Sequence, residues 1–154
     1  QFSAGVTLSV ALVKDLAKHP NIVGMKDSST GNIEGFLFAV RDQFNVMAGS
    51  ANFFLSALFM GATGGVISLA NAFPPIACEL YDLAVSRQYE KAIALNEKVL
   101  RLNKAVSGKG GVAAVKYAMD LAGLVGGDPR LPLLPLKDED RDGLKKALER
   151  EEMI

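Results

Sequence analysis

Three short apolar runs, separated by segments with a helical period, constrain the fold of this chain more than any other feature. The runs are 22–26, 46–48 and 65–69, and helical segments of about ten residues lie between them. Parallel strands cannot be joined by tight hairpins and need crossover connections of this kind. The order therefore predicts an α/β fold with a parallel sheet. Because the runs are continuously apolar, we expect both faces of the sheet to be covered.

Helices are expected on either side of these strands and after them. The first covers 7–18, with Thr7 as its cap, the second runs from Ile33 to about Gln43, and the third runs from Phe53 to Phe59 and ends at Gly61. After Pro75 the pattern is entirely helical, with expected helices at 76–86, 89–106, 112–121 and 142–152.

The length of the chain sets the scale of the fold. Three parallel strands are few for a free-standing doubly wound sheet, and a (β/α)8 barrel needs roughly 250 residues, whereas this chain has 154. We therefore expect the C-terminal portion of something larger, with a partial (β/α) barrel over residues 1–86 and an all-helical region over 87–154. Unpaired strand edges in such a portion would favour association with other chains.

Charge and composition exclude several classes of partner. The 17 basic side chains balance the 17 acidic ones, so no long-range field would attract nucleic acid or an anionic membrane surface. The stretch 43–78 carries no charge, but glycine, asparagine and proline divide it into pieces shorter than the roughly 20 residues of a membrane-spanning helix. The expected partner is a small molecule or another subunit.

Cysteine and histidine usage points to a reducing compartment without a metal site. Cys78 is the single cysteine, so an internal disulfide is excluded and a cytoplasmic location is expected. In its helix we expect Cys78 to be a small buried residue. No Cys/His cluster or carboxylate spacing suggests a bound metal.

Lys26 is the first candidate for chemistry. It ends an apolar strand, and catalytic groups of α/β folds lie at the carboxyl ends of strands. Gly24 shares its face of the strand and leaves room beneath the side chain. Apolar walls would favour the neutral amine, which attacks a ketone carbon to form a Schiff base. The alternative is a solvated lysine paired with Asp27.

Glycines at the ends of the other two strands are the second set of candidates. Gly49-Ser50 and Gly65-Val66-Ile67 would face the same mouth as Lys26. Glycine lets a substrate approach the backbone, and free N–H groups can bind a carboxylate. The alternative is a tight turn into the next helix.

Four segments carry a resemblance to a known family. They are HPNIVGMKDSS at 19–29, AGS at 48–50, GATGGVISLAN at 61–71 and GGDPRLPL at 126–133. In this order they resemble the dihydrodipicolinate synthase/N-acetylneuraminate lyase family of class I aldolases. The resemblance implies a (β/α)8 TIM barrel followed by helices, in which the strands of this chain correspond to strands six, seven and eight.

The resemblance also implies the chemistry. Lys26 would form an imine with pyruvate or the pyruvoyl end of a 2-oxo acid, and the iminium would allow retro-aldol cleavage or, in reverse, enamine attack on an aldehyde. By similarity, Gly65 and the backbone of Ile67 lie beside the substrate, and Ser50 lies with Gly49 at the mouth, where the distal part of the substrate is bound. No cofactor is implied.

The amino-acid sequence of two segments favours one branch of the family. Residues 20–25 and 48–51 are more similar to enzymes acting on 4-hydroxy-2-oxoglutarate or 2-keto-3-deoxy sugar acids. The alternative is a dihydrodipicolinate synthase-type condensation of pyruvate with an aldehyde.

Two parts of the family's machinery have no counterpart in these motifs. The family's acid/base tyrosine lies in a Tyr-Asn-x-Pro segment on strand five, and its carboxylate-binding Thr-Thr pair lies on strand two. Acid/base catalysis alone contributes about 10²–10⁴-fold, so we expect the 154 residues by themselves to be inactive. A second hypothesis is a non-catalytic association module, joined through strand edges and C-terminal helices. A homo-oligomer, a dimer or tetramer, is expected under both.

Overall fold

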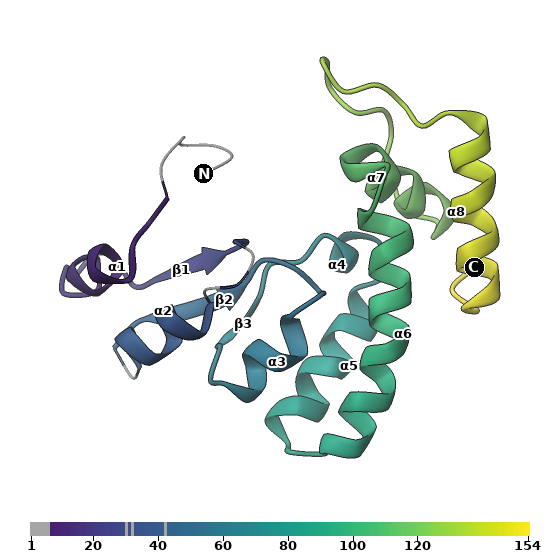
Figure 1. The fold of residues 1–154 in the computed structure, drawn as a ribbon. Helices are drawn as coiled ribbons and strands as arrows, with labels where there is room; N and C mark the ends of the chain where they lie inside the picture. The colour runs from purple at the N-terminus through teal and green to yellow at the C-terminus, as the bar shows by residue number, and fades with distance from the viewer. Residues whose placement is uncertain (1–6, 30, 32, 42) are drawn as a thin grey trace. The chain divides into compact units, whose positions relative to one another are not determined.

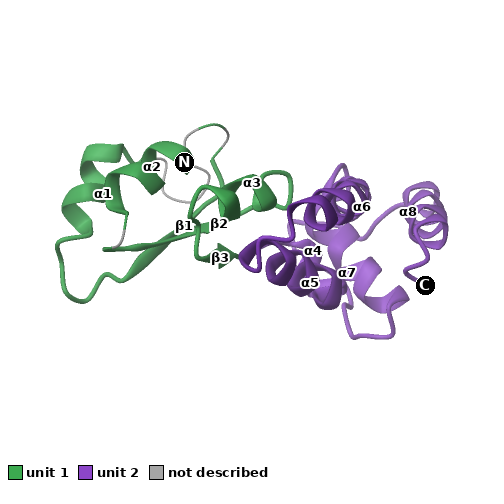
Figure 2. Ribbon diagram, turned by 90° about the horizontal axis from the view of Figure 1, so that it is seen from below, with its two compact units in different colours: residues 1–66 green, residues 67–154 purple. Residues whose placement is uncertain are grey.

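The computed structural model describes residues 7–29, 31, 33–41 and 43–154. The chain divides into two compact units, residues 1–66 and 67–154, which Figure 2 distinguishes by colour and which are described separately below. Over the described part of the chain, no helix has the length and apolar character needed to cross a membrane.

The first unit is built on a three-stranded parallel sheet with the order β1-β2-β3 (Figure 1). Its strands are β1 (Gly24–Asp27), β2 (Asn45–Ala48) and β3 (Gly64–Gly65). In the register, Lys26 lies beside Met47 and Asp27 beside Ala48. The predicted parallel sheet is thus confirmed.

Helices precede and connect these strands. They are α1 (Val10–Leu16), α2 (Ile33–Val40) and α3 (Phe54–Phe59). The first is shorter than the expected 7–18, because the cap is Ser9 rather than Thr7: the Ser9 hydroxyl accepts from the Leu12 N–H at 3.1 Å. The third ends as predicted at Gly61, which has a φ of 103°.

Side-chain alternation gives the sheet a covered face and an open face. Val46 and Ala48 point to the covered face and are 1% and 0% exposed, and both α2 and α3 contact β2. On the other face Lys26 and Met47 are exposed. Within the described residues, α2 and α3 therefore cover one face of the sheet, and the face that carries Lys26 is open; its coverage in a larger protein stays a prediction.

The third strand is shorter than the predicted run 65–69. Its last sheet hydrogen bond runs from the Val66 N–H to the Ala48 carbonyl at 2.8 Å, and helix α4 (Leu69–Ala72) begins soon afterwards. The apolar residues after Gly65 thus enter a helix, which the apolar pattern does not distinguish from a strand.

The second unit is entirely helical, as predicted for the chain after Pro75. Besides α4 it contains α5 (Pro74–Val85), α6 (Tyr89–Ser107), α7 (Gly111–Leu121) and α8 (Asp138–Arg150). Its core includes Leu80, Val99, Leu102, Val106, Ala118 and Leu148, each 0% exposed. Cys78 is exposed, contrary to the prediction, because α5 buries the face that carries Ala77 and Leu80 instead.

Helix α8 is joined to the second unit by a narrow apolar stripe. Leu144 and Leu148 are its buried residues, and α8 contacts both α6 and α7. We expect Leu148→Ala to lower the free energy of unfolding by about 2–5 kcal/mol, since it leaves a cavity in a closed site. Urea unfolding measures this, with the exposed Lys145→Ala as control. Equal losses for the two variants would contradict the role of the stripe.

Candidate active site

Lys26 lies on the open face of the sheet, one residue before the end of β1. Its side chain extends along the sheet toward the end of β2: a Cβ built on Gly49 would lie 2.8 Å from the Lys26 Cε. The Lys26 side chain therefore lies at the carboxyl ends of two neighbouring parallel strands. This is the edge at which α/β enzymes carry catalytic groups.

The surroundings of Lys26 differ from both environments that the sequence predicts for this side chain. Lys26 is exposed, so the apolar walls predicted around it are absent among the described residues. The predicted alternative, a solvated pair with Asp27, is also wrong: Asp27 is only 5% exposed, and its carboxylate accepts hydrogen bonds from Ser29 instead. Within the described ranges Lys26 takes part in no ion pair.

Gly49 is needed because β1 and β2 approach each other closely at their ends. Its N–H donates to the Asp27 carbonyl at 2.7 Å. A Cβ on Gly49 would lie 2.6 Å from that carbonyl oxygen and would collide with the Ser28 hydroxyl. The glycine therefore provides a flat backbone surface, against which the side chains of Lys26 and Ser28 both lie.

Ser28 is a site residue that the sequence reasoning missed. Its hydroxyl lies with the Lys26 Cε at the position that a Gly49 side chain would occupy. A hydroxyl at this position can donate a hydrogen bond to, or accept one from, a molecule bound to the Lys26 amine. The signal was present in the sequence, because residues two apart along an extended segment share a face.

Ser50 and Gly65 lie at the ends of the neighbouring strands. Ser50 follows Gly49 directly, is half-buried, and its hydroxyl accepts from the Asn52 N–H at 3.2 Å in the turn before α3. Gly65 pairs with Ala48, and a Cβ there would lie 2.7 Å from the Phe54 ring. Packing against the Phe54 ring of α3 thus accounts for the absence of a side chain at Gly65, and its role beside a substrate stays a prediction.

Ile67 belongs to the second unit. It is 5% exposed, and its carbonyl accepts from the Ala70 N–H at 3.2 Å in the turn that leads into α4. A role of its backbone beside a substrate stays a prediction.

Metal-ligating side chains do not gather in the described ranges. There is no group of three or more His, Cys, Asp or Glu side chains placed to hold a metal ion.

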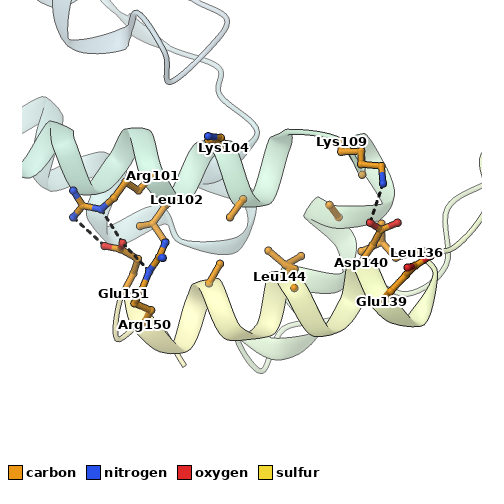
Figure 3. A pocket seen from close by; sticks show the side chains of 15 residues that line it. Arg101, Leu102, Lys104, Lys109, Leu136, Glu139, Asp140, Leu144, Arg150 and Glu151 are labelled. Carbon is orange, nitrogen blue, oxygen red and sulfur yellow. Dashed lines mark hydrogen bonds and ion pairs between the residues drawn. The ribbon is translucent and has the colours of Figure 1, made fainter.

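The second unit contains a groove lined in part by charged side chains. It lies between α6 and α8 with a volume of about 400 Å³, and Figure 3 shows charged side chains at its two ends. Arg101 donates to Glu151 at 2.8 and 3.1 Å at one end, and Lys109 Nζ lies 3.4 Å from Asp140 Oδ1 at the other. The hydrogen bond from Arg101 lowers the pKa of the Glu151 carboxyl below its usual value. The first pair joins α6 to the C-cap residue of α8, and the second joins the turn after α6 to α8. No predicted site residue lines the groove.

Comparison with known proteins decides the family. The model of the dihydrodipicolinate synthetase family matches residues 1–151. The chain belongs to this family. Among curated relatives, the 4-hydroxy-tetrahydrodipicolinate synthase of Methanospirillum hungatei is 33% identical over 149 residues, which are 95% of this chain and 51% of the relative. That of Archaeoglobus fulgidus is 31% identical over 153 residues, 97% of this chain and 53% of the relative.

Solved structures agree with this family. The chloride-inhibited dihydrodipicolinate synthase from Acinetobacter baumannii, complexed with pyruvate, has a TM-score of 0.89 and 31% identity, covering 97% of this chain and 52% of that chain. The Bacteroides thetaiotaomicron synthase has a TM-score of 0.86 and 26% identity, covering 95% and 52%. The chain thus spans about half the length of these relatives and has part of a dihydrodipicolinate synthase-type (β/α)8 barrel. Its correspondence to strands six to eight stays a prediction.

The close approach at Gly49 can be tested by adding one methyl group. Gly49→Ala is expected to displace the Lys26 and Ser28 side chains and to lower the free energy of unfolding by about 1–3 kcal/mol through overpacking. Gly64→Ala is the matched control, because a Cβ on Gly64 meets nothing within 4 Å. Chemical unfolding of both variants measures the difference. A Gly49→Ala variant as stable as the control would contradict the close approach.

Proposed function

We propose that Lys26 is the Schiff-base lysine of a class I aldolase or lyase acting on pyruvate or another 2-oxo acid. The proposal is carried by the placement of the Lys26 Cε against Gly49, at the carboxyl ends of β1 and β2. Membership of the dihydrodipicolinate synthetase family supports it. The relative from Acinetobacter baumannii, described in complex with pyruvate, supports the substrate class.

The proposed reaction uses the amine as a covalent catalyst. Lys26 Nζ adds to the ketone carbon of the 2-oxo acid, and loss of water gives an iminium. In a 4-hydroxy-2-oxo acid, the electrons of the C3–C4 bond then move toward the iminium to leave an enamine, while a base takes the hydroxyl proton and the aldehyde departs. Protonation of the enamine and hydrolysis release pyruvate and the free amine. The reverse sequence condenses pyruvate with an aldehyde.

Neighbouring groups are assigned to the substrate. Gly49 leaves space at the imine because it has no side chain. The Ser28 hydroxyl, which lies with the Lys26 Cε against Gly49, would bind a hydroxyl on the substrate chain. Ser50, at the start of the next turn, would contact the distal part of the substrate. Gly65 and the Ile67 backbone would lie beside the substrate, as the resemblance implies.

Two candidate reactions are consistent with this chemistry. We favour 4-hydroxy-2-oxoglutarate or a 2-keto-3-deoxy sugar acid, on the similarity of segments 20–25 and 48–51 to that branch. The second candidate is condensation of pyruvate with an aldehyde, favoured by the names of the relatives, which are 4-hydroxy-tetrahydrodipicolinate synthases.

We infer that the 154 residues alone bind a ketone covalently without turning it over. The chain matches only 51% of the Methanospirillum hungatei synthase, and its motifs include neither the family's acid/base tyrosine nor its Thr-Thr pair. Imine formation needs the amine, whereas C–C cleavage also needs a group to move the hydroxyl proton.

Borohydride reduction in the presence of pyruvate tests the mechanism. The reduced adduct is expected on Lys26 in preference to the other lysines of the chain, and Lys26→Arg should abolish it, because a guanidinium does not form the imine. Peptide mapping by mass spectrometry locates the adduct, with the exposed Lys14 and Lys18 as internal controls. An adduct spread evenly over the lysines would rule out a Schiff-base role for Lys26.

A role in association is the second candidate function, and the open sheet supports it. The order β1-β2-β3 leaves β1 at the edge of the described sheet, and Met47 and Val66 are 36% and 52% exposed. Free strand edges and apolar side chains favour pairing with another chain. We therefore propose a homo-oligomer, a dimer or tetramer.

Light scattering of the 154-residue chain tests association. A dimer or larger species is expected, and Met47→Lys should weaken it, because this change places a second ammonium group beside Lys26 in the register. Leu12→Lys, at an exposed position on α1, is the matched control. A stable monomer at every concentration would contradict the association role.

A further inference from the structure

Asp27 is a buried charge that the proposed reaction does not use. It is 5% exposed and is the only charged residue buried among those that the structure describes. Its Oδ1 accepts from the Ser29 N–H at 2.9 Å and from the Ser29 hydroxyl at 2.6 Å. Its Oδ2 is buried without a hydrogen-bond partner in the described part of the chain. Burial of an incompletely bonded carboxylate is unfavourable, so stability alone does not explain this residue.

The bonds to Ser29 fix the backbone on either side of Ser28. An aspartate that accepts from the N–H two residues further along closes an Asx turn, and Ser28 is the residue enclosed by this turn. The Asp27 carbonyl also accepts from the Gly49 N–H at 2.7 Å. Asp27 therefore fixes the turn that carries Ser28, and it also fixes the distance between this turn and the end of β2.

The consequence is a defined place for the Ser28 hydroxyl beside the lysine. Both the Ser28 Oγ and the Lys26 Cε lie against Gly49. Without the Asx turn, the exposed Ser28 backbone would sample other conformations and its hydroxyl would leave this place. A substrate bound through Lys26 would then lose a hydrogen-bonding partner.

We propose that Asp27 is a positioning residue, whose buried carboxylate holds Ser28 beside Lys26 and thereby favours 2-oxo acids that carry a hydroxyl over pyruvate. The inference rests on the proposed Schiff-base function. Pyruvate has no hydroxyl on its chain, so it cannot form the hydrogen bond assigned here to Ser28, whereas the 2-oxo acid group is common to both compounds. Asp27 acts through Ser28 and Ser29 and does not itself touch the substrate.

Three variants separate positioning from general stability. Asp27→Ala removes the acceptor of both hydrogen bonds, Ser29→Ala removes only the hydroxyl donor, and Asp27→Asn retains an oxygen that accepts both. Ser29→Ala keeps the test valid if Asp27→Ala does not fold. Asp15→Ala is the matched control, since Asp15 is an exposed aspartate on α1 that pairs with Lys18.

The readout is a ratio of two rates, that of borohydride trapping of 4-hydroxy-2-oxoglutarate on Lys26 divided by that of pyruvate. Intact and cleaved adducts are both counted. Thermal unfolding checks that each variant is folded. Asp27→Ala and Ser29→Ala are expected to lower this ratio about five- to tenfold, the effect of one hydrogen bond, without changing the pyruvate rate. Asp27→Asn should restore the ratio, and Asp15→Ala should leave it unchanged.

Two results would overturn the inference while leaving the Schiff base intact. One is an unchanged ratio in Asp27→Ala and Ser29→Ala. The other is an equal fall of both rates, which indicates a purely structural role. If the unmodified chain forms no Lys26 adduct with either compound, the proposed function fails, and the inference fails with it.

Discussion

The close approach of β1 and β2 at Gly49 is the constraint on which the rest of the site depends. The Gly49 N–H continues the sheet beyond Ala48 by donating to the Asp27 carbonyl at 2.7 Å, and no side chain fits at Gly49. The same contact gives Lys26 and Ser28 a common surface. A single backbone hydrogen bond thus joins the fold of the sheet to the arrangement of the groups proposed for chemistry.

The local sequence predicts the elements of this chain better than their ends. Hydrophobic period and glycine or proline positions are local properties, so the parallel sheet and the helices after Pro75 follow from them. The end of β3 does not, because an apolar run that continues into α4 has the same composition as a strand. The first helix shows the same limit: Thr7 and Ser9 can both cap it, and only the backbone path selects Ser9.

The candidate site shows which of its properties the sequence encodes. Lys26 and Gly49 can be found from their positions at strand ends, and Ser28 could have been found from the two-residue period. The burial of Asp27 could not, because it depends on how the turn folds back on its own carboxylate. The exposure of Lys26 likewise depends on which elements surround the open face of the sheet, and no local pattern specifies that.

A crystal structure of the chain after reduction with borohydride and pyruvate tests the central claim most directly. We predict continuous density from Lys26 Nζ to the former ketone carbon of pyruvate, with the adduct lying against Gly49 and beside the Ser28 hydroxyl. An unmodified Lys26, or an adduct directed away from the carboxyl ends of β1 and β2, would contradict the account.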